Sequence, residues 1–438
     1  MITRLLGTMR RIATDRFAVG SAIMAGAIVL GNALSFLALP FLARLYTPEA
    51  FGIFGFVISW ITILGVLMTL RFESIIPITN STSAAAALAR RSINRSVFFA
   101  LLLVLALAIA TMAGAIRGSI GPIELLTGIG GAFAASYFAI GRSLHQRLDR
   151  YSVIASSTIV RSVVFAGGAL LLALLPHRLG LSGGAALLLA SMLSFLVPAA
   201  IYHLTVDGLF RTSLLPGRAL KESKSNFSDS ALSKVSLTFV LSQTSFQFPL
   251  WIAMFLFGSA ATGWVTMSYR LAMFPSDILC GSVALVLARR IADSISHHPD
   301  RIAADRRHLA LFLIANFFLF GLLGLLIWIG AGPLLGPEWA EAAPVMGMLA
   351  ALGLSFTIQP SVIQVFSLLK REREILAITI AHVALMLLGA VAIWLFDADL
   401  MSAAIGLTVL EILLSVALTY FALIMTKAVS DQTGISDR

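Results

Sequence analysis

The sequence predicts an all-α polytopic membrane protein in which about 12 transmembrane helices form two six-helix bundles around a central cleft. Of its 438 residues, 59% are hydrophobic and only 12% are charged, about half of the roughly 25% charge expected of a soluble domain. The mean hydropathy is +0.95, and apolar runs recur at close to the ~20 residues that one membrane crossing needs. The single cysteine, Cys280, excludes an intrachain disulfide.

Six apolar runs precede the longest polar stretch of the chain and six follow it. We therefore expect an N-terminal bundle at 17–205, a cytoplasmic linker at 206–234, a C-terminal bundle at 235–426 and a cytoplasmic tail at 427–438. The individual runs lie near 17–39, 50–70, 97–116, 120–140, 152–175, 181–205, 235–257, 262–287, 308–330, 344–369, 375–396 and 401–426.

The placement of the basic residues predicts the orientation of these spans. The formal net charge of +10 would suit a nucleic-acid-binding protein, but 26 of the 31 Lys and Arg residues lie in the termini and in every second connection between the runs. By the positive-inside rule, both termini are then cytoplasmic. Residues 1–16 combine arginines with apolar residues at helical spacing, which predicts an amphipathic helix on the anionic inner leaflet.

Ionisable residues within spans are costly and are therefore candidates for function. Arg270 lies about eight residues into the eighth span, and Arg161 lies in the fifth, so each predicted bundle contributes one cation. Together they would form an anion-binding cleft, although Arg270 could instead pair permanently with an acid from another helix. Arg71 ends the second span, either as an interfacial arginine or as a third member of the cleft, and Glu73 is its expected partner. Pro77 is the expected end of that helix.

Three acids are candidates for ion coupling. Glu411 lies near the middle of the twelfth span and Asp277 lies two turns beyond Arg270, and a buried carboxyl group of this kind can carry a coupled proton. Glu73 is the third. The alternative for Glu411 is a protonated acid hydrogen-bonded between helices, and His382 in the eleventh span has the same two interpretations.

Uncharged polar side chains within the spans are candidates for lining a cavity. Such groups usually form hydrogen bonds between helices, but a ligand rich in hydroxyl groups needs the same chemistry. They are Asn32, Gln243, Gln247, Gln359 and Gln364.

The sequence disfavours an enzyme. It contains no Gly-x4-Gly-Lys-Ser/Thr phosphate-binding loop, and its extracytoplasmic connections are too short for the catalytic loop of a membrane polymerase or ligase. The Asp397–Asp399 pattern resembles a metal-binding glycosyltransferase motif, but it falls on the outer side, away from cytosolic nucleotide sugars. We expect no cofactor and no metal.

Several segments resemble the bacterial polysaccharide-biosynthesis and O-antigen flippases of the multidrug/oligosaccharidyl-lipid/polysaccharide exporter (MOP) superfamily. The family pattern around the first two helices is matched by Pro40, by Tyr46-Thr47-Pro48-Glu49, by Phe51-Gly52 and by Leu70-Arg71-Phe72-Glu73. The stretch "RLDRYSVIASSTIVRSV" is similar to the start of the family's fifth helix, and "GWVTMSYRLAMFPSDIL" is similar to its eighth helix. The segment "SNFSDSALSKVSL" departs from the family, which usually has an aromatic residue and a proline before its seventh helix.

The resemblance implies a flippase of the bacterial cytoplasmic (inner) membrane. Such a protein moves a polyprenyl-diphosphate-linked oligosaccharide from the inner to the outer leaflet for exopolysaccharide or cell-surface polysaccharide synthesis. A cationic cavity accepts the diphosphate, the lipid tail stays among membrane lipids, and a gradient of H+ or Na+ drives alternating access in some members. Arg270 matches the family's cavity arginine, and Arg161 and Arg71 are further matches. Polysaccharide assembly proteins are implied partners, and nucleic acid is not.

Three other functions compete with this one. A drug/cation antiporter of the same superfamily would have an acidic cavity, whereas the deep charges here are mainly basic. A glycan polymerase or ligase would need a large outer loop. A purely structural membrane scaffold would leave Arg161 and Arg270 without a role.

Overall fold

In a computed structural model of the protein, the described part of the chain is mainly helical. Among the described residues there is no β-strand, so the predicted all-α class is confirmed. The described residues are 16–79, 81–115, 120–174, 180–206, 208–215, 229–278, 290–291, 302–368 and 372–432.

The first half of the chain forms six long helices with shorter ones between them. The short elements are α4 (Phe72–Ile75), the 3-10 helix η1 (Ile76–Ile78) and α10 (Gly208–Ser213). The long helices are α2 (Arg16–Leu45), α3 (Pro48–Thr69), α5 (Thr82–Met112), α6 (Pro122–Arg147), α7 (Tyr151–Leu174) and α9 (Gly183–Thr205).

The second half of the chain repeats this pattern of long helices. Its short elements are the π-helix η2 (Ala253–Phe257), the 3-10 helices η5 (Pro337–Trp339) and η6 (Ala350–Leu352), and α15 (Ala343–Leu349). The long helices are α11 (Asp229–Ile252), α12 (Gly258–Ile278), α14 (Ile302–Leu335), α16 (Gly353–Leu368), α17 (Glu372–Leu395) and α18 (Leu400–Gln432).

The twelve apolar runs of the sequence coincide with helix over most of the residues that the structure describes, and residues 279–287 of the eighth run lie outside them. Eleven helical stretches of the described chain are long and apolar enough to cross a membrane, and one of them, Phe239–Asp277, covers parts of both α11 and α12. The protein is therefore a multi-pass membrane protein, because no soluble fold would expose so many apolar helices of this length.

Several helices extend beyond their apolar runs. α5 begins at Thr82 rather than near 97, because the alanine-rich segment after Ser81 has high helix propensity and Ser81 Oγ accepts a hydrogen bond from Ala84 N at 3.1 Å. α18 continues through Gln432, into the segment expected as a tail at 427–438.

Two other segments expected to lie outside the bundles are described only in part. The expected linker at 206–234 contains α10 and the first turns of α11. The amphipathic segment expected at 1–16 lies outside the described residues, apart from Arg16.

Two compact units divide the chain. One comprises Met1–Leu45 and Val57–Val240, and the other comprises Tyr46–Phe56 and Leu241–Arg438. We call these unit 1 and unit 2. The division passes through α3, so the first turns of this helix pack in unit 2 and the rest packs in unit 1.

Unit 1 is built on contacts of α2 with α7 and of α9 with both α6 and α7. Glycines bring α6 close to α3, since a Cβ added at Gly128 or Gly131 would lie 2.6 or 2.8 Å from side-chain atoms of Val57 or Ile61. Such small residues allow helices to approach closely where the surrounding lipid supplies no hydrophobic driving force.

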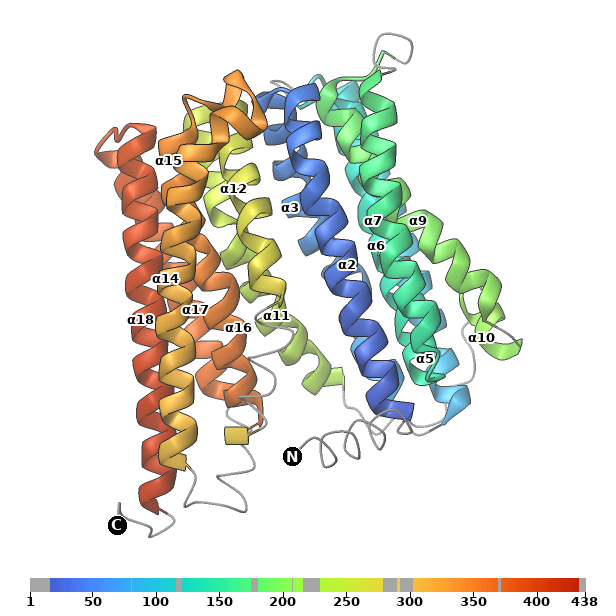
Figure 1. The fold of residues 1–438 in the computed structure, drawn as a ribbon. Helices are drawn as coiled ribbons and strands as arrows, with labels where there is room; N and C mark the ends of the chain where they lie inside the picture. Colours follow the sequence, from blue (N-terminus) through green and yellow to red (C-terminus); the bar gives the residue numbers. More distant parts are fainter. Residues whose placement is uncertain are drawn as a thin grey trace, which may run out of the picture. The chain divides into compact units, whose positions relative to one another are not determined.

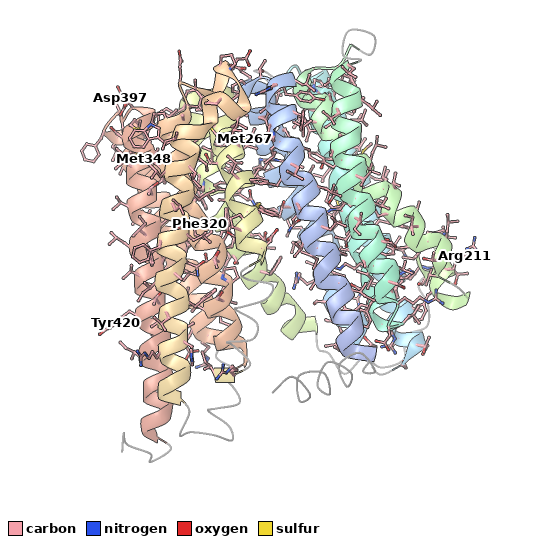
Figure 2. The ribbon with its side chains drawn as sticks, viewed as in Figure 1. Arg211, Met267, Phe320, Met348, Asp397 and Tyr420 are labelled. Carbon is pink, nitrogen blue, oxygen red and sulfur yellow. The ribbon has the colours of Figure 1, made fainter. Side chains whose placement is uncertain are left out.

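Unit 2 is organised around α18, which packs against α14, α15, α16 and α17, and Figure 1 shows α14, α17 and α18 side by side. Phe320 on α14 is only 1% exposed and lies inside this unit (Figure 2). It belongs to an apolar cluster with residues of α12, α16, α17 and α18.

The start of α3 touches α12 backbone to backbone within unit 2. A Cβ added at Gly52 would lie 1.8 Å from Ser259 O, and one added at Gly263 would lie 1.9 Å from Pro48 O. These distances leave no room for any side chain larger than hydrogen, because the obstructing atoms belong to the backbone. The glycines thus explain why Tyr46–Phe56 groups with unit 2 rather than with the rest of its own bundle.

We predict that Gly263→Ala lowers the thermal unfolding temperature of the purified protein. The new methyl group would collide with Pro48 O, and overpacking of this kind costs about 1–3 kcal/mol. The measurement is a melting curve in detergent. Gly406→Ala in α18 is the matched control, because a Cβ at Gly406 meets no atom within 4 Å. Equal melting temperatures for the two variants would contradict the close contact.

Candidate functional site

Arg270 lies deeper in its helix than the sequence indicated. Because α12 begins at Gly258, Arg270 follows twelve residues later, after a helical rise of ~18 Å. Its side chain is partly buried, and its guanidinium Cζ lies 4.6 Å from the ring centroid of Phe54 on α3. An aromatic face attracts a cation, more strongly when both are withdrawn from water.

The residues around Arg270 fix its backbone. Its neighbour Tyr269 is 7% exposed, donates a hydrogen bond from its hydroxyl to Phe246 O at 3.0 Å and packs edge-to-face on Phe356 at 4.9 Å. On the other side, a Cβ at Gly55 would lie 1.8 Å from Thr266 Oγ1, one turn before Arg270. Phe54 is therefore held against α12 by the neighbouring glycine of its own helix.

Arg161 in unit 1 has a similar aromatic environment. Its Cζ lies 5.2 Å from the ring centroid of Phe195 on α9 and 5.9 Å from that of Phe138 on α6. The side chain is partly buried. Each unit thus holds one deep arginine against aromatic rings from other helices, which sequence spacing alone does not reveal.

Arg71 follows the end of α3 and contacts both an acidic and an aromatic side chain. Its Nε lies 3.9 Å from Glu73 Oε1, which is the predicted pairing, and its Cζ lies 3.8 Å from the ring centroid of Phe239 on α11. The expected helix end at Pro77 is wrong. The helix ends at Thr69 because Leu70 and Arg71 adopt left-handed conformations with φ of 46° and 61°, and Pro77 lies in η1.

A buried acid–base pair occupies the interior of unit 2. Glu411 Oε1 on α18 lies 3.2 Å from His382 Nε2 on α17, and Glu411 Oε2 accepts a hydrogen bond from the hydroxyl of Ser355 on α16. Glu411, His382 and Ser355 are 3%, 0% and 3% exposed. One turn after Ser355, the 1%-exposed Gln359 has no hydrogen-bond partner for either amide atom.

The other predicted site residues have less distinctive surroundings. Asp277 is exposed in the last turn of α12, so it lacks the burial that would suit a proton carrier. Asn32, Gln243 and Gln247 are partly exposed on α2 and α11. The side chain of Gln364 lies outside the described residues.

The described residues offer no cluster of three or more His, Cys, Asp or Glu side chains that could hold a metal ion. In the turn between α17 and α18, which Figure 2 marks by Asp397, Asp399 Oδ1 accepts a hydrogen bond from Ser402 N at 3.1 Å. Asp399 therefore caps the first turn of α18. This local role accounts for one of the two aspartates of the glycosyltransferase-like pattern.

Comparison with solved structures gives the same fold for the whole chain. An outward-facing multidrug resistance MATE family transporter of the MOP superfamily is 18% identical, with a TM-score of 0.57 over 96% of this chain and 98% of that one. The inward-facing conformation of such a transporter gives 15% identity and a TM-score of 0.58 over 94% and 96%.

A third solved structure is a MOP superfamily transporter from Pyrococcus furiosus. It is 15% identical, with a TM-score of 0.61 over 95% of this chain and 97% of that one. That protein is described as having a binding pocket of reverse polarity, which suggests a different function for it.

The comparison of sequences identifies the family. No curated protein matches the chain at a significant level. The sequence model of the family described as "Polysaccharide biosynthesis protein" matches residues 17–295, which is more than half of the chain and includes Arg71, Arg161 and Arg270. The protein belongs to the polysaccharide biosynthesis protein family, and its fold is that of the MOP superfamily transporters.

Proposed function

We propose that the protein is a flippase that moves a polyprenyl-diphosphate-linked oligosaccharide from the inner to the outer leaflet of the bacterial cytoplasmic membrane. The glycan serves exopolysaccharide, O-antigen or other cell-surface polysaccharide synthesis. In this proposal both termini are cytoplasmic, which the positive-inside rule supports through the basic connections between spans. Transport proceeds by alternating access, and the lipid tail remains in the membrane.

The observation that carries this proposal is the deep arginine on an aromatic ring. A guanidinium group that lies over an aromatic ring contacts the ring through the flat face of the guanidinium. The N–H edge of the guanidinium recognises phosphates, because its donors can bind two oxygens at once. The contact of Arg270 with Phe54 at 4.6 Å therefore positions the cation in a way that suits a diphosphate. Arg161 has the same arrangement in unit 1, and Arg71 is a third cation at the end of α3.

A cationic site of this kind addresses the main obstacle to flipping. A diphosphate head group would meet a prohibitive desolvation cost in hydrocarbon. Arginine side chains in a water-filled cleft offset that cost, and partly exposed polar groups such as Asn32, Gln243 and Gln247 suit the hydroxyl groups of the sugars. Nothing in this process needs a covalent step, so the protein is not an enzyme and needs no cofactor.

The transport cycle is coupled to an H+ or Na+ gradient. Of the three acids considered, Glu411 suits this role best because it is buried. Asp277 is exposed, and Glu73 is engaged with Arg71.

A drug/cation antiporter is the second candidate, favoured by the likeness of the fold to multidrug resistance transporters. It would bind a cationic substrate, so the test is whether small organic cations or anionic lipid-linked glycans cross the membrane. The charge of the deep arginines favours the glycan.

We predict that Arg270→Ala reduces flipping by at least about tenfold, since one hydrogen bond to a charged group contributes ~1.5–3 kcal/mol. Arg270→Lys should retain part of the activity, because it keeps the charge but loses the bidentate edge. The measurement is the accessibility of a polyprenyl-diphosphate-linked oligosaccharide on the opposite face of proteoliposomes.

The matched control is Arg211→Ala, which removes the same charge from an exposed arginine on α10 (Figure 2). It should flip glycan like the wild type. Normal flipping by Arg270→Ala would contradict the cationic site. Failure of the wild type to move any of several glycans under proton and sodium gradients would instead favour the antiporter.

A separate prediction concerns the aromatic ring. Phe54→Leu should slow flipping several-fold, because a cation–π contact that is not fully desolvated contributes ~1 kcal/mol, whereas Phe54→Tyr keeps the ring and should preserve most of the activity. Initial flipping rates of the two variants, measured at equal protein content, provide the comparison. Equal rates would show that Phe54 only fills space.

A further inference from the structure

Glu411 and His382 form a buried pair in unit 2, and their hydrogen bonds join three helices. Glu411 and His382 come from two helices and Ser355 from a third, and all three side chains are at most 3% exposed. Both oxygens of Glu411 are engaged, one with His382 Nε2 and the other with the Ser355 hydroxyl. An ionised Glu411 would accept a hydrogen bond at each oxygen in this arrangement.

The imidazole of His382 has one nitrogen left over. With Glu411 ionised, His382 Nε2 carries a hydrogen and donates it at 3.2 Å. In neutral imidazole the other nitrogen, Nδ1, then has a lone pair that can accept a proton. This atom is buried and has no hydrogen-bond partner.

The net charge of the pair depends on that atom. A carboxylate beside a neutral imidazole carries one negative charge, whereas a carboxylate beside an imidazolium is neutral overall. A net charge in a dry interior is costly, and a compensated pair is much less so. Proton uptake at His382 Nδ1 would therefore stabilise the pair where it is shielded from water.

The neighbouring helices differ in the charge that they bring near the pair. On α12, Tyr269 interacts electrostatically with Glu411, and the charged residues of the same helix are Arg270 and Asp277. α16 contains no ionisable residue, α14 contains none after His308, and α11 contains none after Lys234. On α17 and α18 the remaining ionisable side chains are close to the helix ends, except for Tyr420.

Apolar residues enclose the pair along the helices. About one turn away on one side are Leu352, Met386 and Leu407, each at most 5% exposed, and about two turns away on the other side are Val362, Ile375 and Leu418, each at most 8% exposed.

Between the pair and the second apolar group lies one further polar layer. One turn from Ser355, His382 and Glu411 respectively are Gln359, Thr379 and Ser415, which are all at most 1% exposed. Both amide atoms of Gln359 lack a partner. By the predicted orientation of the spans, this layer lies on the cytoplasmic side of the pair, where it offers polar groups along a path for a proton.

We propose that His382 and Glu411 form a proton-binding site in which His382 Nδ1 takes up one proton and Glu411 stabilises the imidazolium. A proton suits the site better than Na+, because Na+ needs several oxygen ligands and both carboxylate oxygens here already accept hydrogen bonds. The coupling role of the site depends on the proposed transport function, but proton binding does not. The protonated pair has no net charge, so proton uptake favours the conformation of the protein in which the pair is shielded from water. A proton gradient can therefore bias the transport cycle.

Proton binding is tested on the purified full-length chain by NMR of labelled histidine side chains between about pH 5 and 9. The chain has seven histidines, and the signal lost in His382→Gln identifies His382. This signal should titrate in the wild type. Glu411→Gln removes the compensating charge, so it should weaken proton binding about tenfold or more.

Ser355→Ala provides a change of opposite sign. Removing the hydroxyl that donates to Glu411 leaves the carboxylate less stabilised, so the imidazolium should be held several-fold more tightly. Glu49→Gln, an exposed acid, is the control and should change nothing. Circular dichroism and gel filtration show that each variant is folded. A His382 signal that does not titrate, or that titrates identically in the wild type and Glu411→Gln, would overturn the proposal.

A transport measurement separates this inference from the proposed function. Under a proton gradient, His382→Gln and Glu411→Gln should lose the stimulation of flipping that the wild type shows, while still moving glycan down its own gradient. Retained stimulation would overturn the coupling role. If the wild type moves no glycan at all, the flippase proposal fails while the titration result stands.

Discussion

Hydrocarbon provides no partners for polar groups, and this constraint governs every buried charge in the protein. Backbone groups are satisfied by helices, so the remaining question is how ionisable side chains are accommodated within the spans. Two solutions occur. Arginines lie over aromatic rings, as with Arg270 on Phe54, and the buried acid Glu411 contacts an imidazole and a hydroxyl.

The two solutions have different consequences for function. An aromatic ring attracts a cation without neutralising it, so this contact leaves the charge of the arginine in place. In the pair of Glu411 and His382, both carboxylate oxygens have a hydrogen-bond partner, whereas one imidazole nitrogen has none. The first arrangement suits recognition of a large anion, and the second suits exchange of a proton. Both chemistries lie in unit 2, where α12 contributes Arg270 and Tyr269 on adjacent positions.

Glycine contacts link these chemical features to the architecture. The start of α3 lies so close to α12 that Gly52 and Gly263 admit no side chain, and this contact brings Phe54 to Arg270. For this reason the boundary between unit 1 and unit 2 passes through α3.

The sequence alone determined the class of fold, because apolar runs of about 20 residues leave few alternatives, and its basic connections predict one orientation. It also pointed to Arg270, Arg71 with Glu73, and Glu411, because ionisable residues within spans are conspicuous. It could not identify Phe54, Phe195 or Phe239 as partners, since aromatic residues are common in membrane helices and these lie far from the arginines in the chain. It likewise left His382 and Glu411 as separate candidates. Only the tertiary structure decided that they form one site, because contacts between α16, α17 and α18 depend on side-chain packing and not on the period of any single helix.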